Sequence, residues 1–248
     1  MSSLTDQLAE SGFAIIPELL TESEVKVLKS ALASAPGNRG GQRNLLDLPV
    51  VAALATDARI RALVEPVLGV QALPVRTLLF DKTPDANWKV AWHQDLTIAV
   101  REQRDVEGYG PWSTKAGVVH VQPPPTILEG MLAVRLHLDD CGVRNGPVRV
   151  LPGSHRAGKI SGVEIPQWRD RVAEVVCIVP RGGVLLMRPL LLHASSSATS
   201  PAHRRVIHIE FASGGLAAGL AWHWASPVSR VLPNKRLHAA GGGIQGSR

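Results

Sequence analysis

The chain has 248 residues, enough to bury a sizeable core, and its 45% hydrophobic and 19% charged residues are typical of a globular protein. No run approaches 18 uninterrupted apolar residues, which argues against a membrane span. The net charge of +6 invites a nucleic-acid partner, but Lys and Arg are spread along the chain without a long basic run, so we expect none.

Two further features bear on the compartment. Residues 1–10 have neither a basic start nor an apolar core, so we expect no secretory signal. Cys141 and Cys177 are the only cysteines, too few for a disulfide framework. We therefore expect a cytoplasmic protein that acts on a small molecule, away from membranes. The sequence leaves its oligomeric state open.

The N-terminal third reads as mostly helical. Residues 12–17 predict a short apolar strand. Thr21 then stands as an N-cap with Glu24 at the third helical position, a capping box that begins a helix ending before residue 36. Residues 57–68 predict a second helix. We expect residues 1–70 to form a helical buttress.

From residue 70 onward the pattern changes to short strands separated by Gly and Pro turns. In residues 131–140 the leucines and valines at even positions share one face, and Arg135 and His137 share the other. The predicted strands are 71–80, 131–140, 148–151, 175–179, 183–188 and 205–211. Many short strands after a helical segment predict a mainly β protein with flanking helices, a jelly roll. We expect a single domain over 1–248, with a jelly-roll core at 71–215 and a tail at 216–248.

Residues 100–129 show little periodicity and contain three consecutive prolines, 123–125. Long irregular segments of this kind are commonly functional loops or lids. This one follows directly after the motif described next, so we consider it a candidate lid.

The segment Trp92-His93-Gln94-Asp95 carries the strongest chemical signal. On an extended segment His93 and Asp95 point the same way. If His193 came alongside, two histidines and one carboxylate would share one face of a metal, as in non-haem Fe(II) oxygenases, and leave coordination positions open. The alternatives are a turn residue with a hydrogen-bonded neighbour and a buried structural histidine.

Arg204 lies eleven positions after His193 and opens a predicted strand. An arginine at a strand start beside a metal site suits bidentate binding of a carboxylate. A solvated charge at the strand end is the alternative for Arg204, and the neighbouring Arg205 competes for the same role.

Three segments together resemble the phytanoyl-CoA dioxygenase family: Leu78 to Asp95, Asn145 to His155 with its Leu-Pro-Gly-Ser-His, and His193 with Arg204. Their order and spacing agree with the family, and the resemblance covers roughly residues 10–215. It implies a dioxygenase that uses Fe(II), 2-oxoglutarate and O2 on a double-stranded β-helix, a cupin-like jelly roll.

Carried over by position, the resemblance implies catalytic metal ligands at His93, Asp95 and His193. Arg204 would hold the distal carboxylate of 2-oxoglutarate with help from Ser195, and Arg205 remains the competing anchor. Substrate contacts are expected at Gln94 and Trp92, which flank the ligands, and at Arg135 and His137. Arg135 stands where relatives carry an aromatic residue; with His137 it would anchor an anionic substrate, unless that strand face meets solvent.

The implied reaction is hydroxylation of an unactivated C–H bond in a small molecule, with release of succinate and CO2. Relatives that halogenate have a small residue in place of the carboxylate, so Asp95 favours hydroxylation. Two alternatives remain. One is a catalytically silent metal- and 2-oxoglutarate-binding protein of the same fold, and the other is a cupin-type isomerase or hydrolase with another metal.

Overall fold

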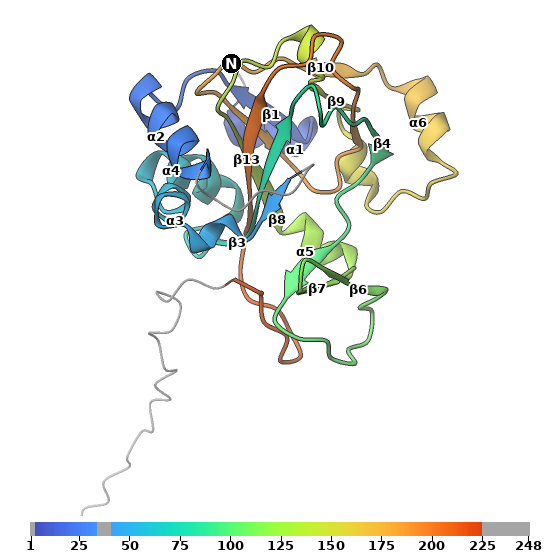
Figure 1. The fold of residues 1–248 in the computed structure, drawn as a ribbon. Coiled ribbons are helices and arrows are strands. Elements are labelled where there is room, and N and C mark those ends of the chain that lie inside the picture. The colour runs from blue at the N-terminus through green and yellow to red at the C-terminus, as the bar shows by residue number, and fades with distance from the viewer. Residues whose placement is uncertain (1–2, 34–40, 225–248) are drawn as a thin grey trace, which may run out of the picture.

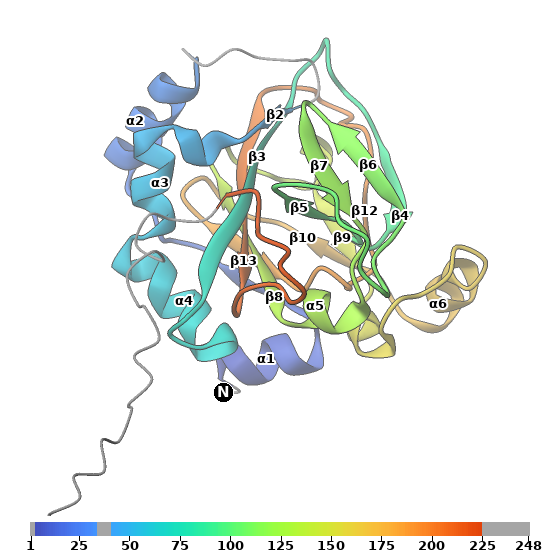
Figure 2. The ribbon, with the colours of Figure 1, turned by 90° about the horizontal axis from the view of Figure 1, so that it is seen from below.

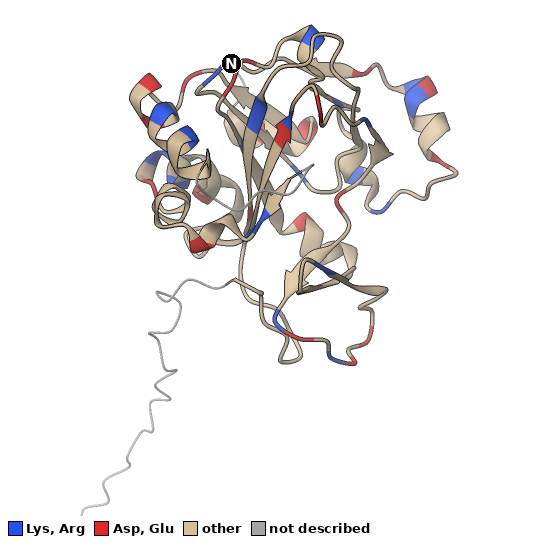
Figure 3. Ribbon diagram, in the orientation of Figure 1, with Lys and Arg blue, Asp and Glu red and all other residues tan. Residues whose placement is uncertain are grey.

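The computed structural model describes residues 3–33 and 41–224 (Figure 1). Within these ranges no helix has both the length and the apolar composition needed to cross a membrane. Lys and Arg are distributed over helices, strands and loops alongside Asp and Glu (Figure 3). The helices are α1 (Leu4–Glu10), α2 (Glu22–Ala33), α3 (Pro49–Ala55), α4 (Ala58–Leu68), α5 (Pro125–Glu129) and α6 (Ile165–Arg171). The strands are β1 (Phe13–Ile16), β2 (Gln42–Arg43), β3 (Leu73–Lys82), β4 (Val90–His93), β5 (Ile98–Val100), β6 (Trp112–Lys115), β7 (Val118–Val121), β8 (Met131–His137), β9 (Val148–Val150), β10 (Val175–Cys177), β11 (Val184–Met187), β12 (His193–Ser195) and β13 (Arg204–Ala212).

A six-stranded sheet with the order β1-β11-β8-β13-β3-β2 forms the centre of the molecule. Its longest strand pairings join β13 to β3 on one side and to β8 on the other, and both are antiparallel. Helices α1 to α4 lie together against one face of this sheet (Figure 2). The first seventy residues also supply its two edge strands, β1 and β2, so the N-terminal part is not purely helical.

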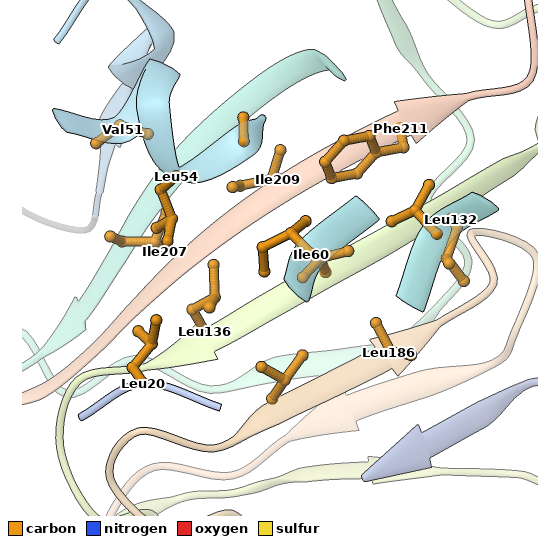
Figure 4. Packing of buried hydrophobic residues seen from close by; sticks show 14 of the residues in the cluster. Leu20, Val51, Leu54, Ile60, Leu132, Leu136, Leu186, Ile207, Ile209 and Phe211 are labelled. Atoms are coloured by element: carbon orange, nitrogen blue, oxygen red, sulfur yellow. The ribbon is translucent and has the colours of Figure 1, made fainter. Parts of the chain in front are cut away.

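The main core lies between this sheet and the helices (Figure 4). Ile207, Ile209 and Phe211 alternate along β13 and are fully buried, as are Leu132 and Leu136 on β8. Complete burial of each such side chain contributes about 1.5–3 kcal/mol relative to an exposed position. The even-numbered face predicted for residues 131–140 is therefore the helix-facing side of the sheet.

A second sheet with the order β10-β9-β12-β4 covers the opposite face of the large sheet. That face is apolar where β1 and β11 meet β9 and β10, and it carries buried polar side chains on β3, β8 and β13. All of β8 is buried, so the alternative in which Arg135 and His137 meet solvent is wrong. The two facing sheets with helices on one side confirm the predicted mainly β, jelly-roll class. The polar part of the layer between the sheets contains the candidate site.

The prediction that residues 100–129 are irregular is partly wrong. Strands β6 and β7 form an antiparallel hairpin that continues to β5 in a three-stranded sheet, and α5 follows. The sequence missed the hairpin because each of its strands is only four residues long. Lys115, at the end of β6, reaches the candidate site described below.

The predicted helix signals at the N-terminal end are confirmed. The Thr21 N–H donates to Glu24 Oε2 at 2.8 Å, and the Glu24 N–H donates to Thr21 Oγ1 at 3.3 Å, which is the capping box of α2. Asp57 caps α4 by accepting from the Arg59 N–H at 2.8 Å. The expected helix stop near residue 36 and most of the predicted tail lie outside the described residues.

Candidate metal centre

Two histidines that are far apart in the sequence meet across a strand pair. Strand β12 pairs antiparallel with β4, and the register places His193 directly opposite His93. Their ring centroids are 4.2 Å apart. Asp95 follows β4, and its backbone N–H donates to Pro189 O at 2.9 Å, which fixes the carboxylate next to the two rings.

Both imidazoles are held with the same nitrogen free. His93 Nδ1 lies 2.8 Å from Ala91 O, and His193 Nδ1 lies 2.8 Å from Leu191 O. A carbonyl accepts only, so each Nδ1 must carry the proton and each Nε2 keeps its lone pair. A backbone partner of this kind is what orients metal-binding histidines.

The free nitrogens face the carboxylate. His93 Nε2 lies 3.8 Å from Asp95 Oδ1, and His193 Nε2 lies 3.7 Å from Asp95 Oδ2. The three ligand atoms all lie within 4.8 Å of one another, and no other such group occurs in the described parts of the chain. Two imidazole nitrogens and one carboxylate oxygen are the donor set of non-haem Fe(II) sites.

The protonation states suit a metal as well. Burial lowers the pKa of His193 to about 4, so its ring is neutral at neutral pH. Burial alone would raise the pKa of Asp95, but the surrounding histidines and Arg76 outweigh it and hold that pKa below its ordinary value. The carboxylate is therefore ionised, and it and the neutral His193 ring are ready to donate electron pairs.

The three residues line one side of a cavity of about 250 Å³ between the two sheets. Its other walls come mainly from the large sheet, including its edge strand β2, and from Lys115 at the end of β6. The remaining lining residues are Arg43, Arg76, Leu78, Phe80, Trp88, Val90, Thr97, Lys115, Arg135, Val148, Ala194, Ser195, Arg204 and His208.

Arg204 and Ser195, the expected 2-oxoglutarate contacts, lie together at one end of the cavity. Arg204 is only 3% exposed; one nitrogen donates to Gly146 O, and its buried Nε has no hydrogen-bond partner. Lys82 lies opposite Arg204 in the β3–β13 register and donates to Ser195 Oγ at 3.2 Å. This end therefore presents a guanidinium and a hydroxyl to an anion, with the fully buried Lys82 ammonium next to Ser195.

Arg205, the competing anchor, points to the other side of the sheet. Its Nε and Nη2 donate to the Asp139 carboxylate at 2.8 and 2.9 Å. This bidentate ion pair occupies its guanidinium and leaves it outside the cavity lining. The geometry favours Arg204 over Arg205.

Gln94 and Trp92 are not cavity residues, contrary to expectation. The Gln94 amide donates to Gly158 O at 2.8 Å and to Leu190 O at 2.6 Å, and it accepts from the Ile160 N–H at 2.8 Å. Trp92 packs against a small apolar cluster on the same side. Because side chains alternate along a strand, the residues that flank the ligands must point away from them.

Arg135 and His137 lie in different environments. Arg135 lines the cavity, donates to His208 Nδ1 at 2.9 Å and lies over the Phe80 ring at 5.2 Å. His137 is outside the lining, and burial lowers its pKa to about 3. A neutral, enclosed imidazole does not anchor an anion, so the expectation for His137 is not supported.

Four cavity residues were not predicted from the sequence. Arg43, Arg76, Lys115 and His208 come from four different strands, and only pairing brings them together. A signal was present for His208, because it lies an even number of positions after Arg204 on β13 and therefore shares a strand face with it. For Arg43 and Lys115 no sequence pattern distinguished them from surface cations.

The family comparison gives one clear match. The model of the family described as Phytanoyl-CoA dioxygenase (PhyH) matches residues 8–206. A curated relative, "Phytanoyl-CoA dioxygenase, peroxisomal" of Bos taurus, is 27% identical over 166 residues, which are 60% of this chain and 42% of the relative. The chain thus spans less than half the length of that relative.

Solved structures agree in fold. EctD from S. alaskensis with bound Fe superposes with a TM-score of 0.65 at 20% identity, covering 86% of this chain and 77% of that one. The same protein with 2-oxoglutarate and 5-hydroxyectoine gives 0.64 at 19% identity, covering 84% and 74%. AviO1 from Streptomyces viridochromogenes Tue57 gives 0.61 at 19% identity, covering 86% and 96%. These likenesses confirm the predicted cupin-like fold.

Proposed function

We propose that this chain, which belongs to the phytanoyl-CoA dioxygenase family, is an Fe(II)- and 2-oxoglutarate-dependent dioxygenase that hydroxylates a small molecule. One observation carries the proposal: two Nε2 lone pairs and one carboxylate converge at the wall of a cavity whose far end holds a buried arginine. A 2-oxoglutarate-dependent hydroxylation would use the first feature to hold the metal and the second to hold the distal carboxylate of the cosubstrate.

His93, Asp95 and His193 would hold the iron. Their donor types fit Fe(II), and three protein ligands leave positions open for small molecules. The carbonyls of Ala91 and Leu191 keep both rings in the binding tautomer and make them better donors. When bound, iron and its cosubstrate supply the oxidising chemistry, in which 2-oxoglutarate and O2 become succinate and CO2 and one oxygen atom enters a C–H bond.

Arg204 would bind the distal carboxylate of 2-oxoglutarate, assisted by Ser195 and Lys82. The free Nε of Arg204 is a buried donor without a partner, and such a donor costs free energy until an acceptor arrives. The carboxylate would satisfy it. Lys82 was not expected from the sequence; its place beside Ser195 adds a second charge to this end.

Asp95 supports hydroxylation over halogenation, because its carboxylate occupies the third ligand position. The partly apolar walls at Leu78, Phe80 and Val148 limit water around the reacting groups. A cytoplasmic location fits the two buried free cysteines and remains a proposal.

The test measures iron binding and turnover separately. Purified protein is loaded anaerobically with Fe(II), and bound metal is counted; succinate release is then followed after adding 2-oxoglutarate and air. We expect His93→Ala and Asp95→Ala to lose both iron and succinate. His223→Ala, a histidine outside the cavity lining, serves as the control and should behave as the unaltered protein.

The outcomes separate the alternatives. Iron bound by all three ligands without any succinate would favour a catalytically silent binding protein. Turnover supported by zinc in the absence of 2-oxoglutarate would favour a cupin-type isomerase or hydrolase. Iron binding unaffected in both ligand variants would refute the assignment.

A further inference from the structure

The cavity holds a second cationic cluster, which consists of Arg43 on β2, Arg76 on β3 and Lys115 on β6. Arg76 pairs with Glu210, yet its Nε is buried without a partner. The backbones of Arg43 and Lys115 pair with Leu78 and Val118, but within the described parts of the chain their side chains form no hydrogen bond or ion pair. Three cations from separate elements thus face two nearby carboxylates, Glu210 and Asp95.

These cations are held together at a cost. Burial lowers the pKa of Arg43, and the neighbouring Arg76 lowers it further. Burial, Arg76 and Arg43 lower the pKa of Lys115 in the same way. Arg43 is exposed and Lys115 is half-buried, so solvent screens part of the repulsion between these like charges, and a bound anion would relieve the remainder.

The charge of the whole cavity points in the same direction. The lining contains five Lys and Arg side chains, with Arg135 and Arg204 joining the second cationic cluster, against the carboxylate of Asp95 and that of Glu210 behind the wall. Iron(II) and the 2-oxoglutarate dianion have equal and opposite charges, so loading the site leaves this positive excess unchanged. A neutral substrate would leave it uncompensated.

The cosubstrate does not account for the cluster. Arg76 pairs with Glu210 in the β3–β13 register, and Lys82 pairs with Arg204 six residues further along each strand. At about 3.4 Å per residue the two rows are about 20 Å apart at the backbone. A five-carbon diacid held at Arg204 and at the metal has no third carboxylate for the other row.

The second cationic cluster lies beside the metal ligands. Asp95 interacts electrostatically with Arg76 and with Lys115. A small molecule bound by the cluster would therefore occupy the cavity that the metal ligands also line. The cavity of about 250 Å³ also has to hold 2-oxoglutarate, which leaves space for a compact partner only.

We propose that the second cationic cluster binds an anionic group of the substrate, so that the substrate is a small carboxylic acid or phosphate ester oxidised a few bonds from that group. This inference rests on the proposed function of the metal centre. Arg76, fixed by Glu210, is the positioned member of the cluster, and Arg43 and Lys115 close on the anion from β2 and β6.

A binding experiment tests the cluster without turnover. Anaerobic protein with Fe(II) and saturating 2-oxoglutarate is titrated calorimetrically with inorganic phosphate and with short monocarboxylates. We expect at least one of these anions to bind, and the Arg43→Gln/Lys115→Gln double variant to bind it at least tenfold more weakly. Lys26→Gln, which removes an exposed cation on α2, should leave the affinity unchanged. Absence of anion binding, or equal binding by the double variant, would overturn the inference.

A turnover screen then distinguishes carboxylic acids from phosphate esters. It also tests the anionic substrate separately from the proposed dioxygenase function. Matched sets of carboxylic acids, their amides and phosphate esters are compared for stimulation of succinate release above the substrate-free rate. We expect stimulation by anions and none by the amides, and the stimulating class identifies the group. Substrate-free succinate release with equal stimulation by amides would refute the anionic substrate and leave the dioxygenase standing. Cluster-dependent anion binding without any succinate would refute the dioxygenase and leave the anion site standing.

Discussion

Replacement of Arg204 by alanine tests the cosubstrate end of the cavity most directly. Arg204 is 3% exposed, so solvent screens its interaction with an anion very little. Each hydrogen bond from a charged donor is worth about 1.5–3 kcal/mol, and a bidentate carboxylate loses two of them. Ser195 and Lys82 remain to bind part of the charge, which leaves a loss of about 3 kcal/mol, or roughly a hundredfold in affinity.

The assay is the apparent KM for 2-oxoglutarate from succinate release, with anaerobic calorimetry of 2-oxoglutarate binding beside it. Arg205→Ala is the matched control, because it removes the neighbouring arginine and its ion pair with Asp139 on the opposite face. We expect that control to lower stability without changing the KM. An Arg204→Ala protein that unfolds like the unaltered protein and shows less than a threefold change in KM would refute the assignment.

Three further predictions concern the same layers. Burial and the nearby Arg204 lower the pKa of Lys82 to about 8, so its charge is present below that pH and is lost above it; calorimetry should show 2-oxoglutarate affinity falling as pH rises through about 8, and a Lys82→Met protein should lack that dependence. Glu210→Gln leaves buried Arg76 without its counter-charge and should lower the free energy of unfolding in urea by about 3 kcal/mol; an unchanged midpoint would contradict this. Leu136→Ala, at a fully buried core position, should cost about 2–5 kcal/mol in the same assay while substrate-free succinate release at 15 °C persists.

Much of the fold was readable from local patterns. Three local patterns are confirmed by the structure: the capping box at Thr21, the alternation in residues 131–140 and the run of short strands. Each depends only on residues that are close together in the sequence. The hairpin of β6 and β7 was missed, because four-residue strands contain too few positions for alternation to appear.

The candidate site was readable only in part. The triad His93, Asp95 and His193 was chosen from spacing and from family resemblance, and the structure brings the three together. Gln94 was misplaced although the alternation that paired His93 with Asp95 also required their neighbour to face away. A residue next to a metal ligand on a strand is expected to point to the opposite face of the sheet.

By itself, the sequence determined the types of donor atom, the secondary-structure elements that carry them and the family to which the chain belongs. Tertiary structure alone decided which cations face the cavity, since Arg43, Arg76 and Lys115 are separated by long stretches of chain and meet only through strand pairing. It also placed Arg204 and Arg205 on opposite sides of one sheet, so that Arg204 lines the cavity while Arg205 pairs with Asp139. Local sequence sets which way a side chain alternates, whereas the layer that it meets depends on how the sheets stack.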